Sequence, residues 1–150
     1  GQRMLAQFGY QQYEISAYAK PGESSRHNLA YWTFADYLGI GAGAHGKITK
    51  PDGTIWRSQK TRTPKNYLAS VPQALVKWQQ VNEQDLPFEL MLNILRLKDG
   101  IEHSPVNLPD WALDQIKQLR SMKLMQTNRL QLSEIGWPHY NDIVGRFIAD

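Results

Sequence analysis

The sequence lacks cysteine altogether, and this absence removes several kinds of chemistry at once. Without thiols, the 150-residue chain can form no disulfide, hold no thiolate-bound metal and use no cysteine nucleophile. It also lacks any apolar run near the roughly 18 residues that a membrane-spanning helix needs. Its first residues, GQRMLAQFGY, contain no apolar core of a signal peptide. We therefore expect a cytoplasmic protein with no transmembrane segment.

The excess of positive charge is confined to one segment. The net charge is +3, yet residues 47–65 alone carry +5 and the remaining residues carry −2. Such a patch could attract phosphates, carboxylates or an acidic partner, and an ordinary solvated hairpin face accounts for it equally well. Apolar residues make up 41% of the chain and charged residues 21%, which is typical of a globular protein of one domain or slightly more.

The first part of the chain is expected to contain most of the strands. Its opening is typical of a helix end, with Gly9 just after the last helical turn, followed by a strand over residues 13–18. A second strand is expected over residues 36–46, and then a hairpin around Pro51-Asp52-Gly53. One helix and one strand cannot build a parallel sheet, and the chain begins with Gly. We therefore expect a fragment that lacks an N-terminal domain, with residues 13–18 at an open sheet edge that could pair in a homodimer.

The second part of the chain changes to helical periodicity. The pattern predicts a mainly helical region over residues 66–150, with Gly100 ending one of its helices and a two-stranded wing near residues 124–133. The helices are expected over residues 64–71, with Pro64 at the first position, and over residues 86–99, 108–123 and 137–150. Helix, helix, wing, helix is a winged-helix-like order. The expected fold class is α+β, with domains at residues 1–60 and 61–150.

Three patterns that would indicate familiar chemistry are weak in this sequence. Residues 41–46 match the dinucleotide motif GxGxxG, but they run into a hairpin instead of opening a helix. As a strand, this segment would place Gly39, Gly41 and Gly43 on one bare face that a flat ligand or a neighbouring element could approach. The four histidines show no metal-ligand spacing, and residues 110–123 are too weakly basic to favour nucleic-acid recognition. No catalytic residues are identified.

The segment RHNLAYWTF, residues 26–34, leaves two interpretations open. Helical spacing of four places His27 beside Tyr31 and Asn28 beside Trp32. In the first interpretation, Asn28 is the N-cap of a helix whose aromatic side chains, including Phe34, are core. In the second, the same residues line a ligand site. Spacing alone does not separate the two.

Taken together, YEIS, HNLAYW, DYLGIGAGAHG and the closing helix-wing-helix order resemble the HemW-like haem chaperones. These proteins are radical S-adenosylmethionine (SAM) relatives of oxygen-independent coproporphyrinogen III oxidase, an enzyme of porphyrin metabolism. The resemblance covers essentially the whole chain, and its most specific part is the HNxxYW box. In that family the box is implicated in haem binding, so the resemblance favours the ligand-site interpretation.

The resemblance implies a specific set of roles. His27 would ligate haem iron, Tyr31 and Trp32 would contact the porphyrin together with Asn28, and Arg26 would pair with a propionate. Family members carry a four-iron four-sulfur cluster and SAM on a partial (β/α) barrel, whose last elements would correspond to the beginning of this chain. Gly41 and Gly43 match a glycine-rich strand near the SAM pocket, whereas the cysteines of the cluster motif are absent.

The expected function is therefore haem binding and delivery to haem-accepting proteins, with no catalysis by this part of the chain. One alternative is the corresponding part of a coproporphyrinogen III oxidase. A nucleic-acid-binding winged helix is a third interpretation, which would give salt-dependent DNA affinity.

Overall fold

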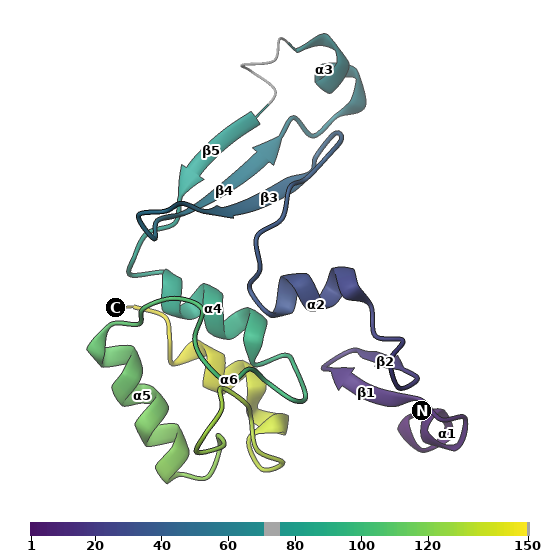
Figure 1. Cartoon of the computed structure of the whole chain (residues 1–150), viewed down its shortest axis with the longest axis vertical. Helices are drawn as coiled ribbons and strands as arrows, with labels where there is room; N and C mark the ends of the chain where they lie inside the picture. The colour runs from purple at the N-terminus through teal and green to yellow at the C-terminus, as the bar shows by residue number, and fades with distance from the viewer. Residues whose placement is uncertain (71–75, 150) are drawn as a thin grey trace. The chain divides into compact units, whose positions relative to one another are not determined.

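The computed structural model describes residues 1–70 and 76–149, which form two compact units (Figure 1). The first unit combines Gly1–Phe34 with Gln84–Asp150, and the second is Ala35–Glu83. The chain therefore leaves the first unit after helix α2 and returns to it before helix α4. The predicted boundary at residue 60 lies inside the second unit. The division into domains 1–60 and 61–150 concerns a longer parent protein and stays a prediction.

The first unit contains a small hairpin and several short helices. Its elements are α1 (Gln2–Gln7), β1 (Gln11–Glu14), β2 (Ala17–Ala19), α2 (Arg26–Trp32), α4 (Leu86–Ile94), α5 (Asp110–Ser121), a 3-10 turn (Trp137–His139) and α6 (Tyr140–Gly145). Gly9 follows α1 with φ of +81°, as predicted for a helix end. Residues 13–18 do not form one strand, because the chain turns at Ile15 and Ser16 and pairs β1 with β2 antiparallel. The sheet has two strands, and the end of β1 also makes an isolated antiparallel bridge from Glu14 to Leu97 on the side away from β2.

The apolar core of this unit is built by its C-terminal helices. α4 ends at Ile94, earlier than predicted, and Gly100 lies beyond it in a turn with φ of +56°. The wing expected near residues 124–133 is present only as isolated antiparallel bridges, Met125 to Leu132 and Ile101 to Leu130. Each fully buried side chain contributes roughly 1.5–3 kcal/mol. The core side chains include Leu90, Met91, Ile94, Leu95, Ala112, Ile116, Leu119, Ile143, Val144 and Phe147.

The second unit is a three-stranded antiparallel sheet with one short helix. Its elements are β3 (His45–Thr49), β4 (Ile55–Lys60), α3 (Pro64–Ala69) and β5 (Val76–Gln80), with strand order β3-β4-β5. The hairpin around Pro51-Asp52-Gly53 is confirmed, with Thr49 opposite Ile55. α3 begins at Pro64 as predicted, whereas β5 was not predicted within the helical region. Residue 71, the last of the helix expected there, and residue 150 lie outside the described residues.

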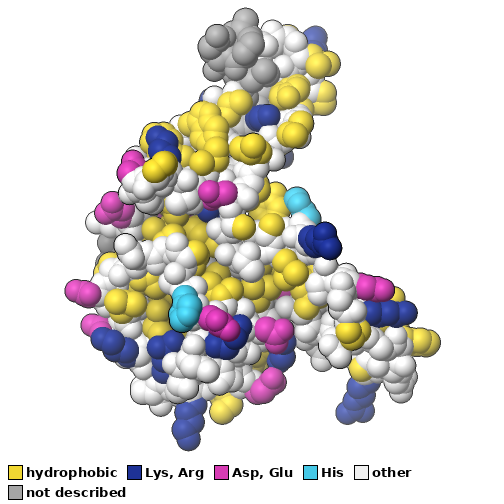
Figure 2. Space-filling view, viewed as in Figure 1, with side chains coloured by type: hydrophobic (Ala, Val, Ile, Leu, Met, Phe, Trp, Pro, Cys, Tyr) yellow, Lys and Arg dark blue, Asp and Glu magenta, His cyan; other side chains and the backbone are white. Residues whose placement is uncertain are grey.

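Several basic side chains of residues 47–65 contact other side chains of the second unit. Lys47 is buried and its Nζ donates to Asp36 Oδ1 at 2.7 Å. Lys50 Nζ lies 3.9 Å from the ring centroid of Trp56, and Arg57 donates to the Tyr37 hydroxyl. Figure 2 shows hydrophobic side chains gathered over the sheet beside Lys and Arg side chains. The segment is therefore a mixed surface, not a continuous basic one.

The helices of the described residues are short or polar. None of them is long and apolar enough to cross a bilayer.

The Asp36 carboxylate anchors the second unit and generates a pH-dependent prediction. Partial burial raises its pKa, but hydrogen bonds from Lys47 and Thr49 and the Lys47 charge outweigh burial, so the pKa is lowered. A carboxyl with a depressed pKa stabilises the fold above its unfolded value of about 3.9, and this contribution is lost as the pH falls through the folded value. Because the Asp36 side chain is 44% exposed and solvent screens its charge, Asp36→Asn should lower the free energy of unfolding by no more than about 1 kcal/mol at pH 7.

Urea unfolding of the wild type and Asp36→Asn at several pH values between 7 and 3 checks this prediction. The difference between the two should begin to shrink near pH 4, where the carboxyl of the unfolded chain is protonated, and should shrink further as the pH falls through the lowered folded pKa. Glu83→Gln, at an exposed position of the same unit, serves as the control and should show no such pH dependence. A difference that stays constant down to pH 3 would contradict the role given to Asp36.

Gly39 provides a second stability prediction. A Cβ built at Gly39 would collide with the backbone carbonyl of His45, which cannot move like a flexible side chain. Gly39→Ala should thus cost about 1–3 kcal/mol, the usual penalty of overpacking. Gly145→Ala is the matched control, because a Cβ there meets open space and should cause no loss. Thermal unfolding of both variants measures the contrast, and equal melting temperatures would refute the close approach.

Candidate functional site

Helix α2 carries five of the predicted site residues on seven positions. Its N-cap is Ser25, whose side chain accepts a hydrogen bond from the backbone N–H of Asn28 at 3.3 Å. The N-cap at Asn28 in the first interpretation is therefore wrong, because the N-cap lies three residues earlier, at Ser25, and the helix begins at Arg26. The helix ends at Thr33, whose hydroxyl donates to the Leu29 carbonyl at 2.8 Å. Phe34, the next residue, is buried as predicted.

The histidine and the aromatic residues of the box form a continuous aromatic group. The ring centroids of His27 and Tyr31 are 4.7 Å apart in an edge-to-face arrangement, as expected for residues one helical turn apart. Tyr31 and Trp32 follow at 6.4 Å between centroids. His27 and Arg26 are exposed, whereas Tyr31 and Trp32 are half-buried. The imidazole is thus accessible to a ligand while the larger rings lie deeper.

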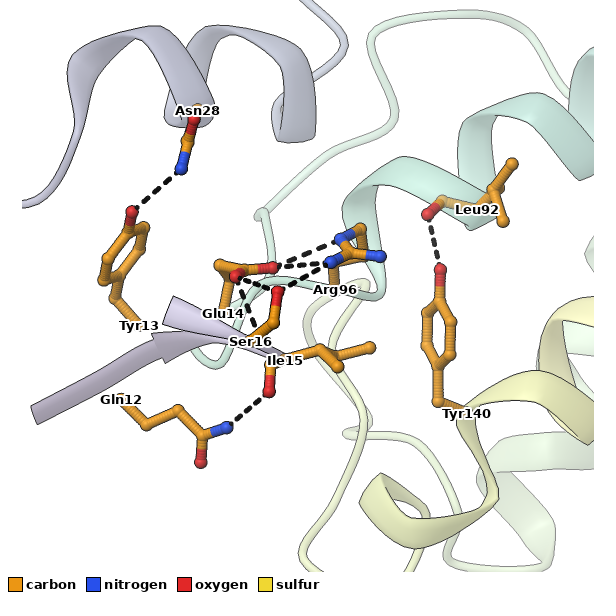
Figure 3. A network of polar contacts seen from close by, with 9 residues as sticks. All are labelled: Gln12, Tyr13, Glu14, Ile15, Ser16, Asn28, Leu92, Arg96 and Tyr140. Carbon is orange, nitrogen blue, oxygen red and sulfur yellow. Dashed lines mark hydrogen bonds and ion pairs between the residues drawn. The ribbon is translucent and has the colours of Figure 1, made fainter. Parts of the chain in front are cut away.

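Asn28 is held by the neighbouring hairpin. Its Nδ2 donates to the hydroxyl of Tyr13 on β1 at 3.2 Å (Figure 3). Since Tyr13 lies fifteen residues earlier in the chain, this bond connects α2 with the β1–β2 hairpin. The side-chain amide of Asn28 therefore connects α2 to the hairpin, and its Nδ2 already has a partner within the protein.

Trp32 is covered by a cation that lies 64 residues further along the chain. The guanidinium carbon of Arg96 lies 4.3 Å from the centroid of the Trp32 ring. Such stacking of guanidinium on an indole face is the most favourable of the cation–π pairs. The Nε1 atom of Trp32 is shielded from solvent and has no hydrogen-bond partner among the described residues. A buried indole N–H without an acceptor is uncommon, and it is a donor that a carboxylate could engage.

A buried carboxylate holds Arg96 in place. Glu14 Oε2 accepts from Arg96 Nη2 at 2.9 Å and from its Nε at 3.2 Å, while Oε1 accepts from the backbone N–H and the hydroxyl of Ser16 (Figure 3). Both oxygens of a side chain that is 2% exposed are therefore satisfied. These hydrogen bonds offset the cost of burying the charge of Glu14.

Tyr140 of α6 completes the surroundings of this ion pair. Its hydroxyl donates to the Leu92 carbonyl of α4 at 2.6 Å (Figure 3). Burial raises the pKa of the Tyr140 phenol, although the nearby Arg96 charge partly offsets the effect. The phenol therefore stays protonated near neutral pH and remains a donor.

Gly41 and Gly43 belong to the second unit, whereas helix α2 belongs to the first. The prediction that residues 36–46 form a strand with a bare glycine face is wrong. Gly41 and Gly43 have φ of +101° and +71°, so the chain bends there; of residues 36–46, His45 and Gly46 begin β3, and Tyr37 makes an isolated bridge to Lys47. The Gly43 N–H donates to the Thr61 carbonyl at 2.8 Å. Their proposed role beside SAM stays a prediction.

Sequence reasoning missed Tyr13, Glu14 and Arg96 as members of the site. Arg96 was visible as a polar position in an otherwise apolar stretch, but its partner Glu14 lies 82 residues away. No spacing rule connects such positions. Among the described residues, no group of three or more His, Asp or Glu side chains is arranged to hold a metal ion.

Comparison with known proteins gives a consistent result. The chain is 52% identical over 100 residues to the heme chaperone HemW of Escherichia coli (strain K12), covering 67% of this chain and 26% of that protein. It is 41% identical over 150 residues to the heme chaperone HemW of Haemophilus influenzae, covering 90% of this chain and 39% of that protein. No family model and no solved structure matches.

A more distant relative has a broader name. The mitochondrial radical S-adenosyl methionine domain-containing protein 1 of Danio rerio is 31% identical over 122 residues, covering 76% of this chain and 28% of that protein. The chain thus spans between a quarter and two-fifths of the length of these relatives. Their similarity confirms the resemblance inferred from the HNxxYW box and its neighbours: the chain belongs to the HemW family.

Proposed function

We propose that helix α2 presents a haem-binding box within a cytoplasmic haem chaperone that passes haem to haem-accepting proteins. The observation that carries the proposal is the aromatic group of α2, with an exposed imidazole at one end and half-buried Tyr31 and Trp32 at the other. A neutral imidazole is a common axial ligand of haem iron, and flat aromatic rings suit the porphyrin face. The relatives named heme chaperones share this family with the chain.

The polar groups around the box also fit this ligand. Haem carries two propionates, and the side chains near α2 offer two kinds of donor for them. Arg26 is an exposed cation at the first position of the helix, suited to a charge-assisted hydrogen bond. The Trp32 Nε1 is a buried donor without a partner among the described residues. A hydrogen-bond donor without a partner, next to an aromatic group, is consistent with a ligand whose carboxylate accepts that hydrogen bond.

The proposal extends to the architecture of the parent protein. Residues 1–60 would be the last elements of a partial (β/α) radical-SAM barrel, followed by a winged-helix-like domain over residues 61–150. A four-iron four-sulfur cluster and SAM would be held by other parts of the parent, because this chain contains no cysteine. Gly41 and Gly43 would lie near the SAM site of that barrel.

Replacing the proposed ligand tests the function. His27→Ala in the intact protein should raise the Kd for haemin at least about tenfold, because a removed ligand costs more than about 1.4 kcal/mol. It should also shift the Soret band. Trp32→Phe keeps much of the stacking surface and should raise the Kd only about two- to fivefold. Titrations followed by absorbance measure both effects.

Two controls make this test decisive. His103→Ala removes another exposed histidine and should leave both affinity and spectrum unchanged. Ser25→Ala removes the observed N-cap and should cost about 1 kcal/mol of stability without a comparable spectral change. Melting curves of every variant establish that it is folded before titration. An unchanged spectrum and Kd in folded His27→Ala would refute the proposal and leave α2 as an ordinary helix with a bulky inner face.

A further inference from the structure

We propose that Arg96 is a positioning residue for the haem-binding box, which acts by holding the indole plane of Trp32 and not by contacting the ligand's charge. This inference rests on the proposed function, since it assigns a role within the same site. Its basis is the geometry around one guanidinium. One side of the group lies over the Trp32 ring at 4.3 Å, and its edge is bound to the carboxylate of Glu14.

The first step of the argument concerns the charge of Arg96. Glu14 is 2% exposed and accepts two hydrogen bonds from Arg96, so the positive charge is already compensated inside the protein. A third hydrogen bond, from Nη2 to the Ser16 hydroxyl at 3.2 Å, directs the same group. A guanidinium engaged in this way is a poor partner for an incoming propionate. The exposed Arg26 is the better placed cation.

The second step concerns the precision with which Arg96 is placed. The backbone at and just after Arg96 is paired with the β1 hairpin, through Ile15 N–H to the Arg96 carbonyl at 3.1 Å and Lys98 N–H to the Tyr13 carbonyl at 3.0 Å. The planar fork of arginine can bind a carboxylate with its edge and stack with its face at the same time. Lysine, a flexible point charge, has neither the planar face nor the fork, so it would not hold the plane of the ring in the same way. Arg96, which lies over the Trp32 ring, is thus itself held in place by hydrogen bonds of its backbone and of its side chain.

The third step follows from the helix that carries Trp32. α2 has seven residues, which is too short for a helix to be stable in water by itself. The orientation of its aromatic residues must therefore come from contacts with other elements. Asn28 provides one such contact through Tyr13, and Trp32 provides the second through Arg96. Removing Arg96 should release the indole while leaving His27 in place.

The chain contains a matched control two residues away. Lys98 Nζ lies 4.8 Å from the centroid of Trp137 and pairs with Glu134 at 2.8 Å, outside the box. Lys98→Met thus removes the same combination of stacking and ion pair as Arg96→Met without touching Trp32. The two variants separate a general loss of a stacked cation from a loss that is specific to the box.

The decisive experiment is a double-mutant cycle on the intact protein with haemin as the probe. Arg96→Met should raise the Kd about three- to tenfold, the scale of one ordered aromatic contact. In the Trp32→Phe background the same substitution should raise it less than about twofold, because residues that act through one another are not additive. Arg96→Lys should lose most of the affinity that Arg96→Met loses, and Lys98→Met should lose none. The loss should be the same at low and high salt.

Several results would overturn the proposal. Equal effects of Arg96→Met in the wild-type and Trp32→Phe backgrounds would show that Arg96 does not act through Trp32. Full affinity in Arg96→Lys, or a loss that disappears at high salt, would show direct pairing with the ligand's carboxylates. Wild-type affinity in folded Arg96→Met would reduce Arg96 to a structural residue. If Arg96→Met does not fold, Arg96→Lys with its own cycle answers the same question. His27→Ala tests the proposed function separately, so a loss there with no loss at Arg96 rejects this inference alone.

Discussion

The ion pair between Glu14 and Arg96 is the interaction on which the first unit depends. It joins the end of β1 to the residues that follow α4, across 82 positions of the chain. Burying a carboxylate costs several kcal/mol unless its oxygens are fully engaged. Here each oxygen of Glu14 accepts two hydrogen bonds, from Arg96 on one side and Ser16 on the other. Loss of either charged partner would leave the other buried and uncompensated, so the pair confers specificity on the arrangement more than net stability.

Alternation along residues 96–98 explains why this pairing has one register. Leu97 is buried and bridges Glu14, while Arg96 and Lys98 on either side of it are partly exposed. In an extended segment, neighbouring side chains point to opposite faces. A shift by one residue would send Leu97 toward solvent and force Arg96 or Lys98 into the core. The apolar side chain therefore sets the register, and the register delivers the guanidinium to Glu14 and Trp32.

Elements governed by local chemistry could be predicted from the sequence, and elements governed by distant partners could not. The Pro51-Asp52-Gly53 hairpin, the start of α3 at Pro64 and the periodic α5 follow from turn residues and helical spacing, and the structure has all three. Residues 36–46 were expected to be a strand because their composition allows one. In the structure, Gly41 and Gly43 take positive φ, and Asp36 is drawn to the buried Lys47. The box residues were found by resemblance, but the cation over Trp32 was not, because 64 residues separate the two and no local pattern connects them.

The two ends of the box differ in how firmly they are held, and this difference matters for a carrier. Trp32 is fixed by Arg96 on its face, and Asn28 is fixed by Tyr13, whereas the imidazole of His27 is exposed and contacts the ring edge of Tyr31. A fixed aromatic surface lowers the entropy lost when a flat ligand binds, because the protein is already ordered. In the proposed function, the exposed His27 imidazole would ligate the iron at a position that a competing ligand from an acceptor protein could reach. The proposed haem delivery would require both firm contact with the porphyrin plane and ready exchange at the iron, and the seven-residue helix α2 carries one firmly held ring, Trp32, and one exposed imidazole, His27.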